Sequence, residues 1–369
     1  MARPTRTLPI AAMICCVLLI AGCHRESPQV MDPAKVKICY IGLTCEAPLF
    51  VAQHKGFFQE EGLEVEMVKT SWDAMQQGLS FGTFDATHTL VPYLLKPIEQ
   101  GVNVKITGGI HKGCLRIQVP VNSDIRTIAD LKGKRIGVAT MGSPPMIFGN
   151  RVLAMNGMDA ATDVDWITYP NDVLERALDQ NRVDAVANSE PIGSLLLAKG
   201  KVRNLADQAV DFPWKDEYCC AVVVNGTLAQ KNPAKAAKIT RAMLKAAKWV
   251  ETNPTAAAQL SVDTKYLAST VELNAIAIAQ LRYIPSVNAC KEGVGHLAQE
   301  MKDRGILNAG TDPAELTNRA WLSLDGVTDE WVEQLVVEKV AGGGKPRMDV
   351  EALTIAASVK SCCAKCCVE

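Results

Sequence analysis

The sequence is poor in aromatic residues, carries almost no net charge and has no apolar run long enough to span a membrane. Aromatic side chains make up 5% of the 369 residues, and the formal net charge is −1. Because nucleic acids bind strongly basic surfaces, this balance argues against a nucleic-acid partner. The few aromatics do not outline a large flat pocket, and those expected nearest to a ligand cleft are Trp72, Tyr93, Trp166 and Trp214.

Residues 1–22 have the composition of a bacterial signal peptide. Arg3 and Arg6 precede an uncharged apolar run that is shorter than the roughly 20 residues of a spanning helix. The run ends in Leu-Ile-Ala-Gly-Cys23, which resembles a lipobox and implies cleavage before Cys23 and acylation of its thiol, for example by palmitate. An ordinary secretory signal that contains a cysteine is the alternative. We expect residues 23–35 to tether the protein to the cell envelope, facing the periplasm or the cell exterior, with the lipid as its only membrane contact.

Cysteine is unusually abundant, with 13 residues. Cys15 and Cys16 leave with the signal peptide and Cys23 takes the lipid, so ten thiols remain. An even number of thiols in an exported protein suggests disulfides. Several of these cysteines are adjacent in sequence, however, and adjacent cysteines rarely bridge each other. Bridges to distant partners, free thiols and soft-metal ligation are all compatible with the sequence.

The mature chain is long enough for two domains, and its pattern is that of an α/β protein. Short apolar or alternating segments predict strands over residues 36–41, 63–68, 135–139, 183–187 and 221–224. Between them lie helical stretches, the longest from Pro233 to Thr252 with Asn232 as its cap. Repeated strand–helix units predict largely parallel sheets.

Several of these segments resemble one family in the right order. They are the Ala-Pro-Leu-Phe-Val-Ala of residues 47–52, the Gly-Phe-Phe of 56–58, the Glu-Gly-Leu-Glu-Val of 61–65, residues 128–138, residues 184–187 with Glu190-Pro191, and Asn232-Pro233. They resemble the nitrate/sulfonate/bicarbonate and thiamine-precursor binding proteins, the NMT1/SsuA-like group. The likeness covers roughly Lys35 to Leu260.

The resemblance implies a type II periplasmic-binding-protein fold, in which two doubly wound lobes close on a ligand. We expect residues 36–118 and 221–330 to form lobe 1, residues 119–220 to form lobe 2, and residues 331–369 to be a C-terminal extension. The chain crosses between lobes near residues 117–121 and 218–224 in this prediction. The family implies a non-catalytic substrate-binding component of an ABC importer, with a permease and ATPase complex as partner and a small polar or anionic molecule as ligand.

Ligands of open α/β sheets bind beyond the carboxyl ends of the strands, at helix N-termini. The loops in those positions supply the predicted ligand-binding residues, which are Cys45, Glu46, His88, His111, Cys114, Thr140, Ser143, Glu190 and Cys219. Ordinary structural roles compete with this interpretation: Thr140 and Ser143 as helix caps, Glu190 as an acid at a helix start, and His111 and Cys114 as packing residues.

Thiols and imidazoles recur on these loops, and both are ligands of soft and borderline metal ions. Cys45, Cys114, Cys219 and Cys220 share the strand ends with His88 and His111. Buried cysteine is usually only a small hydrophobe, and no two of these six residues form a Cys-x-x-Cys pair. A metal or metal chelate is therefore the alternative cargo, for a scavenging lipoprotein on the same fold.

The C-terminal tail carries four thiols within six residues: Cys362, Cys363, Cys366 and Cys367. Such a tail can hold a soft metal ion, whereas the competing interpretation is a terminus without a ligand. No other cofactor is expected. An enzyme resembling thiamine-pyrimidine synthases is a further rival, because Cys219 and Cys220 precede a strand at the place of their cysteine-rich motif. Only two cysteines are present there, so we favour a binding protein.

Overall fold

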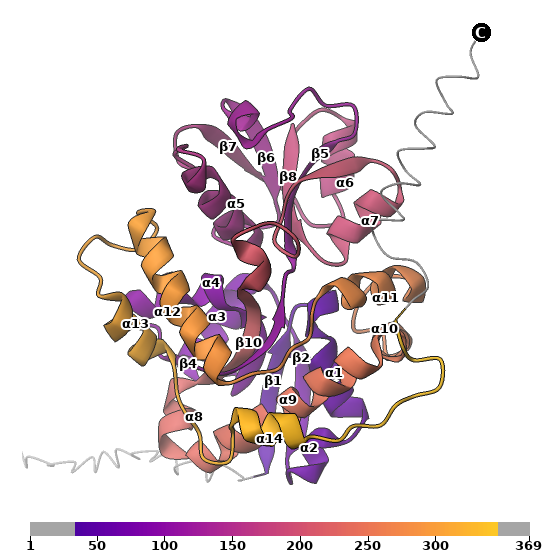
Figure 1. Ribbon diagram of the computed structural model, residues 1–369, viewed down its shortest axis with the longest axis vertical. Helices are drawn as coiled ribbons and strands as arrows, with labels where there is room; N and C mark the ends of the chain where they lie inside the picture. The colour runs from indigo at the N-terminus through magenta and orange to yellow at the C-terminus, as the bar shows by residue number, and fades with distance from the viewer. Residues whose placement is uncertain (1–33, 346–369) are drawn as a thin grey trace, which may run out of the picture. The chain divides into compact units, whose positions relative to one another are not determined.

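The computed structural model describes residues 34–345 (Figure 1), so Cys23 and the four tail cysteines lie outside the described residues. Two five-stranded sheets organise this part of the chain. The first has the order β2-β1-β3-β10-β4, with β1 (Lys35–Tyr40), β2 (Glu64–Lys69), β3 (Ala86–Leu90), β4 (Val104–Lys112) and β10 (Tyr218–Asn225). The second has the order β7-β6-β8-β5-β9, with β5 (Leu115–Pro120), β6 (Lys134–Val138), β7 (Val164–Thr168), β8 (Ala185–Ser189) and β9 (Val202–Asp207).

The two sheets are built alike. In the first, β1 pairs in parallel with β2 and β3, and β10 runs antiparallel between β3 and β4. In the second, β6 pairs in parallel with β7 and β8, and β5 runs antiparallel between β8 and β9. Each sheet therefore receives one strand after a crossing from the other, and the prediction of two α/β lobes is confirmed.

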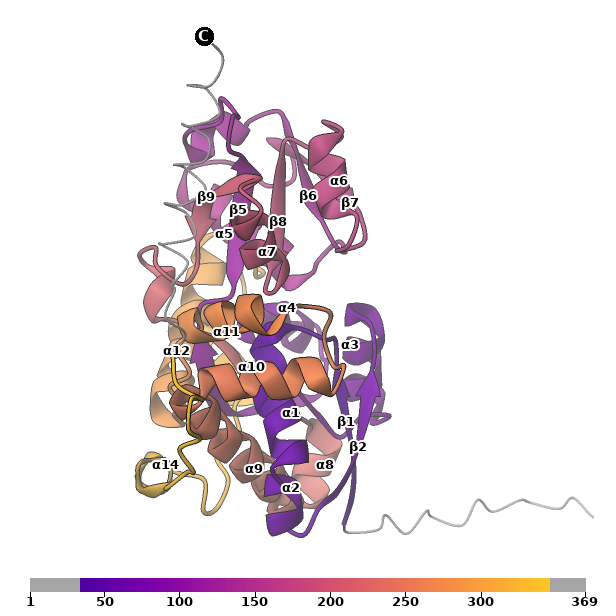
Figure 2. The same ribbon diagram turned by 90° about the vertical axis from the view of Figure 1, so that its right-hand side faces the viewer.

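The crossings lie elsewhere than the sequence suggested. The chain passes from β4 to β5 through Gly113 and Cys114, and from β9 to β10 through residues 208–217 (Figures 1 and 2). The predicted crossing residues, 117–121 and 218–224, lie largely inside β5 and β10. Both strands are continuous and almost entirely buried, so their pattern does not show where the chain crosses. The mark is Gly113, which has φ +73° and where a Cβ atom would lie 2.7 Å from Ala209.

Helices follow the strands of both sheets. In the second lobe they are α5 (Pro144–Met155), α6 (Leu174–Asp179) and α7 (Ile192–Ala198). In the first lobe and after it they are α1 (Ala47–His54), α2 (Phe57–Glu60), α3 (Trp72–Phe81), α4 (Val91–Glu99), α8 (Gly226–Lys231), α9 (Pro233–Thr252), α10 (Pro254–Asp263), α11 (Val271–Gln280), α12 (Asn288–Asp303), α13 (Pro313–Ala320) and α14 (Asp329–Gln334). Three 3₁₀ turns are η1 (Thr44–Glu46), η2 (Ile128–Leu131) and η3 (Trp214–Asp216).

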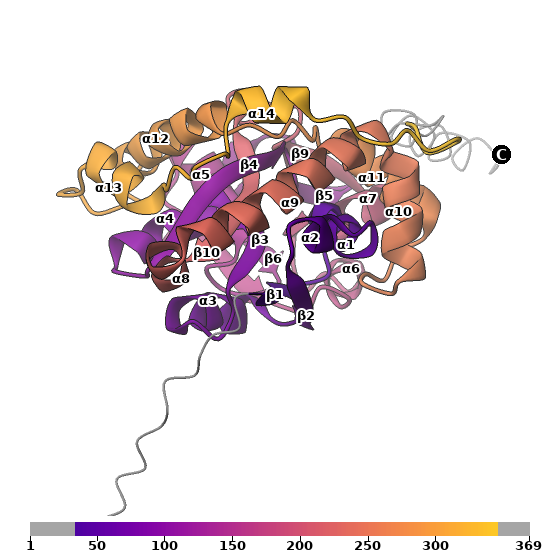
Figure 3. The same ribbon diagram turned by 90° about the horizontal axis from the view of Figure 1, so that it is seen from below.

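Helix α9 shows how sequence sets local structure. The Asn232 side chain accepts a hydrogen bond from the Lys235 backbone N–H, and Pro233 occupies the first turn, where no intrahelical donor is lost. The stripe that includes Ile239, Met243 and Val250 is buried, and α9 packs against α1 (Figure 3). This helix is confirmed with the predicted bounds.

A continuous hydrophobic core runs through both sheets and includes Ile38, Phe50, Ile117 and Ile136. A smaller cluster around Leu174, Val186 and Leu196 lies in the second lobe. Within residues 34–345, no helix is both long and apolar enough to cross a membrane.

Candidate functional site

Four buried thiols lie together where the chain passes between the sheets. Cys45 belongs to η1, Cys114 joins β4 to β5, and the remaining two are the consecutive Cys219 and Cys220 of β10. The Sγ atoms of Cys219 and Cys220 are 3.9 Å apart. Cys45 interacts with the thiols of Cys114 and Cys220, and Cys114 interacts with that of Cys219. We call these four residues the thiol cluster; all of them are free cysteines.

The topology of the first sheet explains this convergence. The loop with Cys45 follows the carboxyl end of β1, and β10 brings its amino end to the same edge because it runs antiparallel to β3 and β4. The pairing sets Cys220 opposite Leu90 of β3 and His111 of β4. Residues from four separate chain segments thus meet at one sheet edge.

Two imidazoles adjoin the thiol cluster. The ring centroids of His88, on β3, and His111, on β4, are 5.4 Å apart, and the His111 ring is 5.1 Å from that of Tyr283. Both histidines are buried, and neither ring nitrogen of either one has a hydrogen-bond partner among the described residues. Burial lowers the pKa of both imidazoles, so both are neutral at physiological pH.

One imidazole and two thiols form a compact donor set. Cys45, His111 and Cys220 each offer a ligand atom, and these atoms all lie within 4.8 Å of one another. Burial raises the pKa of the Cys219 and Cys220 thiols, whereas the hydrogen bond from Cys219 lowers the pKa of Cys114. The contacts within the cluster therefore lower the pKa of the Cys114 thiol while burial raises that of its neighbours.

The predicted ligand Glu46 holds the loop on which Cys45 lies. Its carboxylate accepts hydrogen bonds from the backbone N–H groups of Ile41, Gly42 and Leu43, at 2.7–2.9 Å. Burial raises its pKa to about 7, although these three bonds lower it. Both oxygens are thus engaged by the protein backbone, which gives Glu46 a structural role in shaping the loop after β1.

The predicted ligand Glu190 belongs to a buried ionic network. Arg116 on β5 pairs with the carboxylates of Glu190 and Asp207, and all three side chains are at most 9% exposed. Glu190 also accepts hydrogen bonds from the backbone N–H and the hydroxyl of Ser194. Arg116 donates further to Gln280 on α11 over 2.7 Å, so the network links the second sheet to a helix that packs on the first lobe.

The second lobe contributes buried polar atoms without partners. Ser143 lies at the N-cap of α5, yet its side chain makes no cap hydrogen bond, and its Oγ has no partner among residues 34–345. The same holds for Oδ1 of Asn188, at the end of β8, and for the side-chain amide of Gln208, after β9. Thr140 is only partly buried and contributes its carbonyl oxygen to the Ser143 N–H over 3.1 Å. Ser143 therefore occupies the N-cap position of α5, as the capping interpretation expected, but its hydroxyl does not make a capping hydrogen bond.

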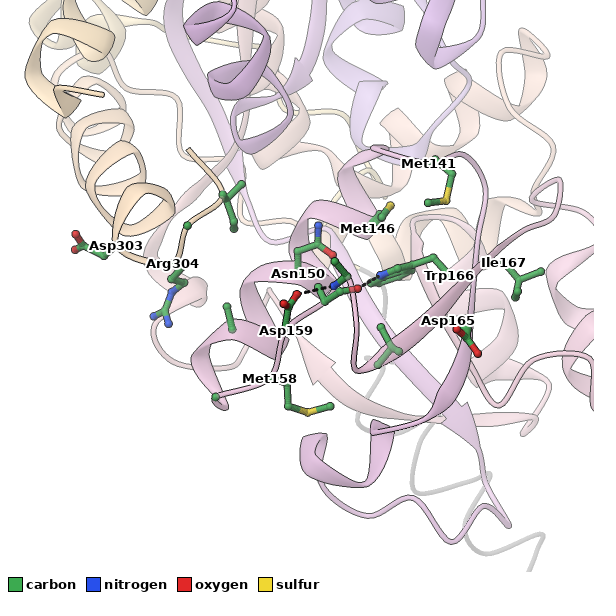
Figure 4. A pocket seen from close by; sticks show the side chains of 17 residues that line it. Met141, Met146, Asn150, Met158, Asp159, Asp165, Trp166, Ile167, Asp303 and Arg304 are labelled. Carbon is green, nitrogen blue, oxygen red and sulfur yellow. Dashed lines mark hydrogen bonds between the residues drawn. The ribbon is translucent and has the colours of Figure 1, made fainter. Parts of the chain in front are cut away.

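A groove of about 1160 Å³ lies on another part of the molecule (Figure 4). It is lined by Met141 before α5, by Met146 of α5, by Met158 after it and by Trp166 of β7, and also by the C-terminal end of α12 with Asp303 and Arg304. Of the four aromatic residues that the sequence placed near a ligand cleft, Trp166 lies at this groove. Trp72, Tyr93 and Trp214 are instead buried, with Trp72 packed on Tyr93 and Trp214 on Phe148.

Sequence reasoning missed several members of the site. Arg116 is the central cation of the buried network, and Tyr283 donates a hydrogen bond to the Cys45 carbonyl over 3.2 Å. Arg116 could have been noticed from the sequence, because it and Gln118 alternate with Leu115, Ile117 and Val119, and these five residues are all buried. Tyr283 lies beyond the last segment with family likeness, and nothing in its sequence neighbourhood marks it.

Comparisons with known proteins agree with this architecture. A model of the NMT1-like family matches residues 29–263. The nitrate/nitrite binding protein NrtA of Nostoc sp. is 27% identical over 249 residues, which are 61% of this chain and 56% of that protein. The putative binding protein YtlA of Bacillus subtilis is 26% identical over 249 residues, which are 63% of this chain and 70% of that protein. The chain spans only slightly more than half the length of the NrtA relative.

Solved structures show the fold. The alkanesulfonate-binding protein SsuA from Xanthomonas axonopodis, bound to MOPS, superposes with a TM-score of 0.65 at 20% identity, covering 78% of this chain and 98% of that one. The periplasmic nitrate-binding protein NrtA from Synechocystis also gives a TM-score of 0.65 at 20% identity, covering 78% and 86%. The two lobes therefore have the periplasmic-binding-protein fold.

Proposed function

This chain belongs to the NMT1-like family, and we propose that it is the substrate-binding component of an ABC importer that captures a small polar or anionic molecule between its two lobes. The permease and ATPase complex of such an importer is the proposed partner. Relatives named as nitrate, nitrite and sulfonate binding proteins support this role. The observation that carries it is a set of buried polar atoms at the strand ends of both sheets that have no partner within the described chain.

These atoms come from both lobes. His88 and Thr89 of the first sheet, Ser143 and Asn188 of the second, and Gln208 of the crossing each have buried side-chain atoms with no hydrogen-bond partner within residues 34–345. A buried polar group without a partner costs about 1–3 kcal/mol. A ligand that supplies the missing partners would recover this free energy, and strand ends are where α/β folds bind ligands.

The side chains favour a ligand recognised by hydrogen bonds. Hydroxyl, amide and neutral imidazole groups each donate and accept, so they suit a small polar molecule or an anion held by N–H and O–H groups. Arg116, the buried cation beside them, is already paired with two carboxylates, Glu190 and Asp207. In this proposal the ligand is held by hydrogen bonds and not by the charge of Arg116.

Contacts between the lobes suit a clamp. Arg116 of β5 binds Gln280 of α11, and Arg151 of α5 pairs with Glu300 of α12. Both contacts join second-lobe elements to helices that follow the first sheet in sequence. In this proposal they form as the lobes close on ligand and break as the lobes open, which couples binding to shape.

Thermal denaturation and titration calorimetry test the proposal on the full chain, washed free of small molecules. The probes are nitrate, nitrite, bicarbonate and methanesulfonate, with chloride as the control salt. A ligand present at 100 times its Kd adds about 2.7 kcal/mol to the free energy of unfolding, so a binding probe should raise the melting temperature clearly. The proposal is wrong if no probe does so and native mass spectrometry of gently purified protein shows no bound small molecule.

We also propose that Cys23 anchors the protein to the outer face of the cytoplasmic membrane or to another envelope membrane. The lipobox-like Leu-Ile-Ala-Gly-Cys23 and the short apolar run before it support this. Membrane fractionation and intact mass of a Cys23→Ser variant provide the test. The anchor is refuted if the variant stays in the membrane fraction with the acyl mass of the wild type.

A further inference from the structure

The thiol cluster and the imidazole beside it consist of metal-ligating groups, which a site that binds a ligand by hydrogen bonds does not require. Two of its thiols lie close to a neighbouring imidazole: the ligand atoms of Cys45, His111 and Cys220 lie within 4.8 Å of one another. All three residues are fully buried. We propose that these three side chains bind one divalent thiophilic cation of the zinc class, which resides in the first lobe at the edge of the crossing.

The distances suit such an ion. Zinc lies about 2.3 Å from a thiolate sulfur and about 2.0–2.1 Å from an imidazole nitrogen, so two tetrahedral ligand atoms lie roughly 3.6–3.8 Å apart. The three donors need to approach by at most about 1 Å, which side-chain rotation can provide. Two thiolates and a neutral imidazole carry two negative charges, and a divalent ion cancels them in a buried site.

The histidine distinguishes this cluster from ordinary buried cysteines. Cys39 donates to the Ala86 carbonyl, 3.8 Å away, and Cys290 packs in the core, as small hydrophobic thiols do. His111, by contrast, is fully buried, and neither ring nitrogen has a partner in hydrogen-bonding geometry among the described residues, although the backbone of Lys112 and Gly113 lies near the ring. A metal ion supplies that partner, whereas packing alone leaves the imidazole unsatisfied.

The position of the donors makes the ion a resident of one lobe. Cys45 follows β1, His111 ends β4 and Cys220 begins β10, and all three strands belong to the first sheet. Lobe closure is therefore not required to assemble the site. The inference goes beyond the proposed function and does not depend on it.

The test uses the full chain with Cys362, Cys363, Cys366 and Cys367 all replaced by serine, so that tail thiols bind no metal. The protein is reduced, kept anaerobic and titrated with Co²⁺, and Zn²⁺ then competes for the site. We expect one cobalt ion per chain with the ligand-field bands of a tetrahedral thiolate site, and displacement of that ion by zinc. Thermal denaturation of the metal-free protein monitors folding.

Variants locate the ion. Cys45→Ala and Cys220→Ala should each weaken Zn²⁺ binding at least about 100-fold, since even loss of an outer-shell partner costs 10–100-fold. His111→Gln should shift the cobalt bands, because it replaces a nitrogen donor. Cys39→Ala removes a buried thiol outside the cluster and should leave affinity and spectrum unchanged. Cys45→Ser serves where Cys45→Ala fails to fold.

The inference is overturned if no cobalt binds, or if Cys39→Ala and Cys45→Ala weaken Zn²⁺ binding equally. It is also overturned if thiol titration shows that the cluster holds disulfides in the protein as isolated. Because nitrate, nitrite, bicarbonate and methanesulfonate are titrated separately, failure of the metal site leaves the proposed function standing. Failure of those probes with intact zinc binding refutes the proposed function alone.

Discussion

The guanidinium of Arg116, on β5 of the second sheet, donates a hydrogen bond to the side-chain oxygen of Gln280, on α11, over 2.7 Å. The same guanidinium pairs with Glu190 and Asp207 inside its own lobe. One buried cation therefore stabilises the second lobe and also contacts the helix that packs against η1 of the first. The side chain that holds the ionic network of the second lobe therefore also makes a hydrogen bond between the lobes.

Gln280→Ala should weaken the closed form without unfolding the protein. A hydrogen bond to a charged group contributes about 1.5–3 kcal/mol, so we expect ligand affinity to fall by roughly 10- to 150-fold. Titration calorimetry with the probe that binds the wild type gives the measurement. Gln259→Ala is the matched control, because within residues 34–345 the Gln259 side chain bonds only to Asp263 on its own helix; an equal loss of affinity there would contradict the role of Gln280.

Arg116→Met should strongly destabilise the second lobe. The substitution leaves the buried carboxylates of Glu190 and Asp207 without their cation, and breaking such a pair costs about 3–5 kcal/mol. Arg135→Met, which removes the more exposed pair with Asp184, should change stability far less. Urea denaturation of both variants tests this, and equal effects would show that the buried network does not stabilise the fold.

Glu46 should impose a pH dependence on stability. Burial raises its pKa from 4.5 to about 7, so the folded chain binds more protons than the unfolded chain between these values. The stabilising contribution is complete below pH 4.5 and is lost as the pH rises to about 7, by an amount on the order of 3 kcal/mol. Glu46→Gln should remove this fall when the two proteins are compared by urea denaturation across that range. A wild-type minus variant difference that does not change with pH would refute the assignment.

Ser143→Ala should separate binding from stability. Its hydroxyl has no partner in the described chain, so the ligand-free melting temperature should stay constant or rise, while probe affinity falls roughly 5- to 150-fold. Asn188→Leu should behave similarly but less cleanly, because the Asn188 amide also donates to Gln118. Ser123→Ala, which loses only a turn contact to Ile125, is the control. Unchanged affinity in Ser143→Ala would place the ligand elsewhere.

Local features of the fold were predictable because single segments encode them. The period-two pattern of β2 and the proline and cap of α9 both produced the expected elements. The approach of Cys45 to His111 was also foreseeable in outline, since both follow or end strands of one sheet. Their meeting with Cys220 depends on the antiparallel insertion of β10, and the strand's own sequence does not reveal its direction.

The ionic network could not be read from the chain because it depends on register. Arg116 lies opposite Asp207 and Asn188 only through the pairing of β5 with β9 and β8, whose sequence separations are about 70–90 residues. Glu190 and Ser143 therefore look alike in sequence, as polar residues before helices. In the structure the first is fully paired, and the second has a hydroxyl that no described residue contacts.

Small-angle X-ray scattering tests the central claim most directly. The full chain is measured after removal of bound small molecules and again with a saturating amount of the probe that raises its melting temperature. We predict a smaller radius of gyration in the bound state, and a smaller decrease for Gln280→Ala at a subsaturating amount of the same probe. A probe that binds fully while the scattering curve stays unchanged would contradict the proposal that this protein closes its two lobes on a ligand.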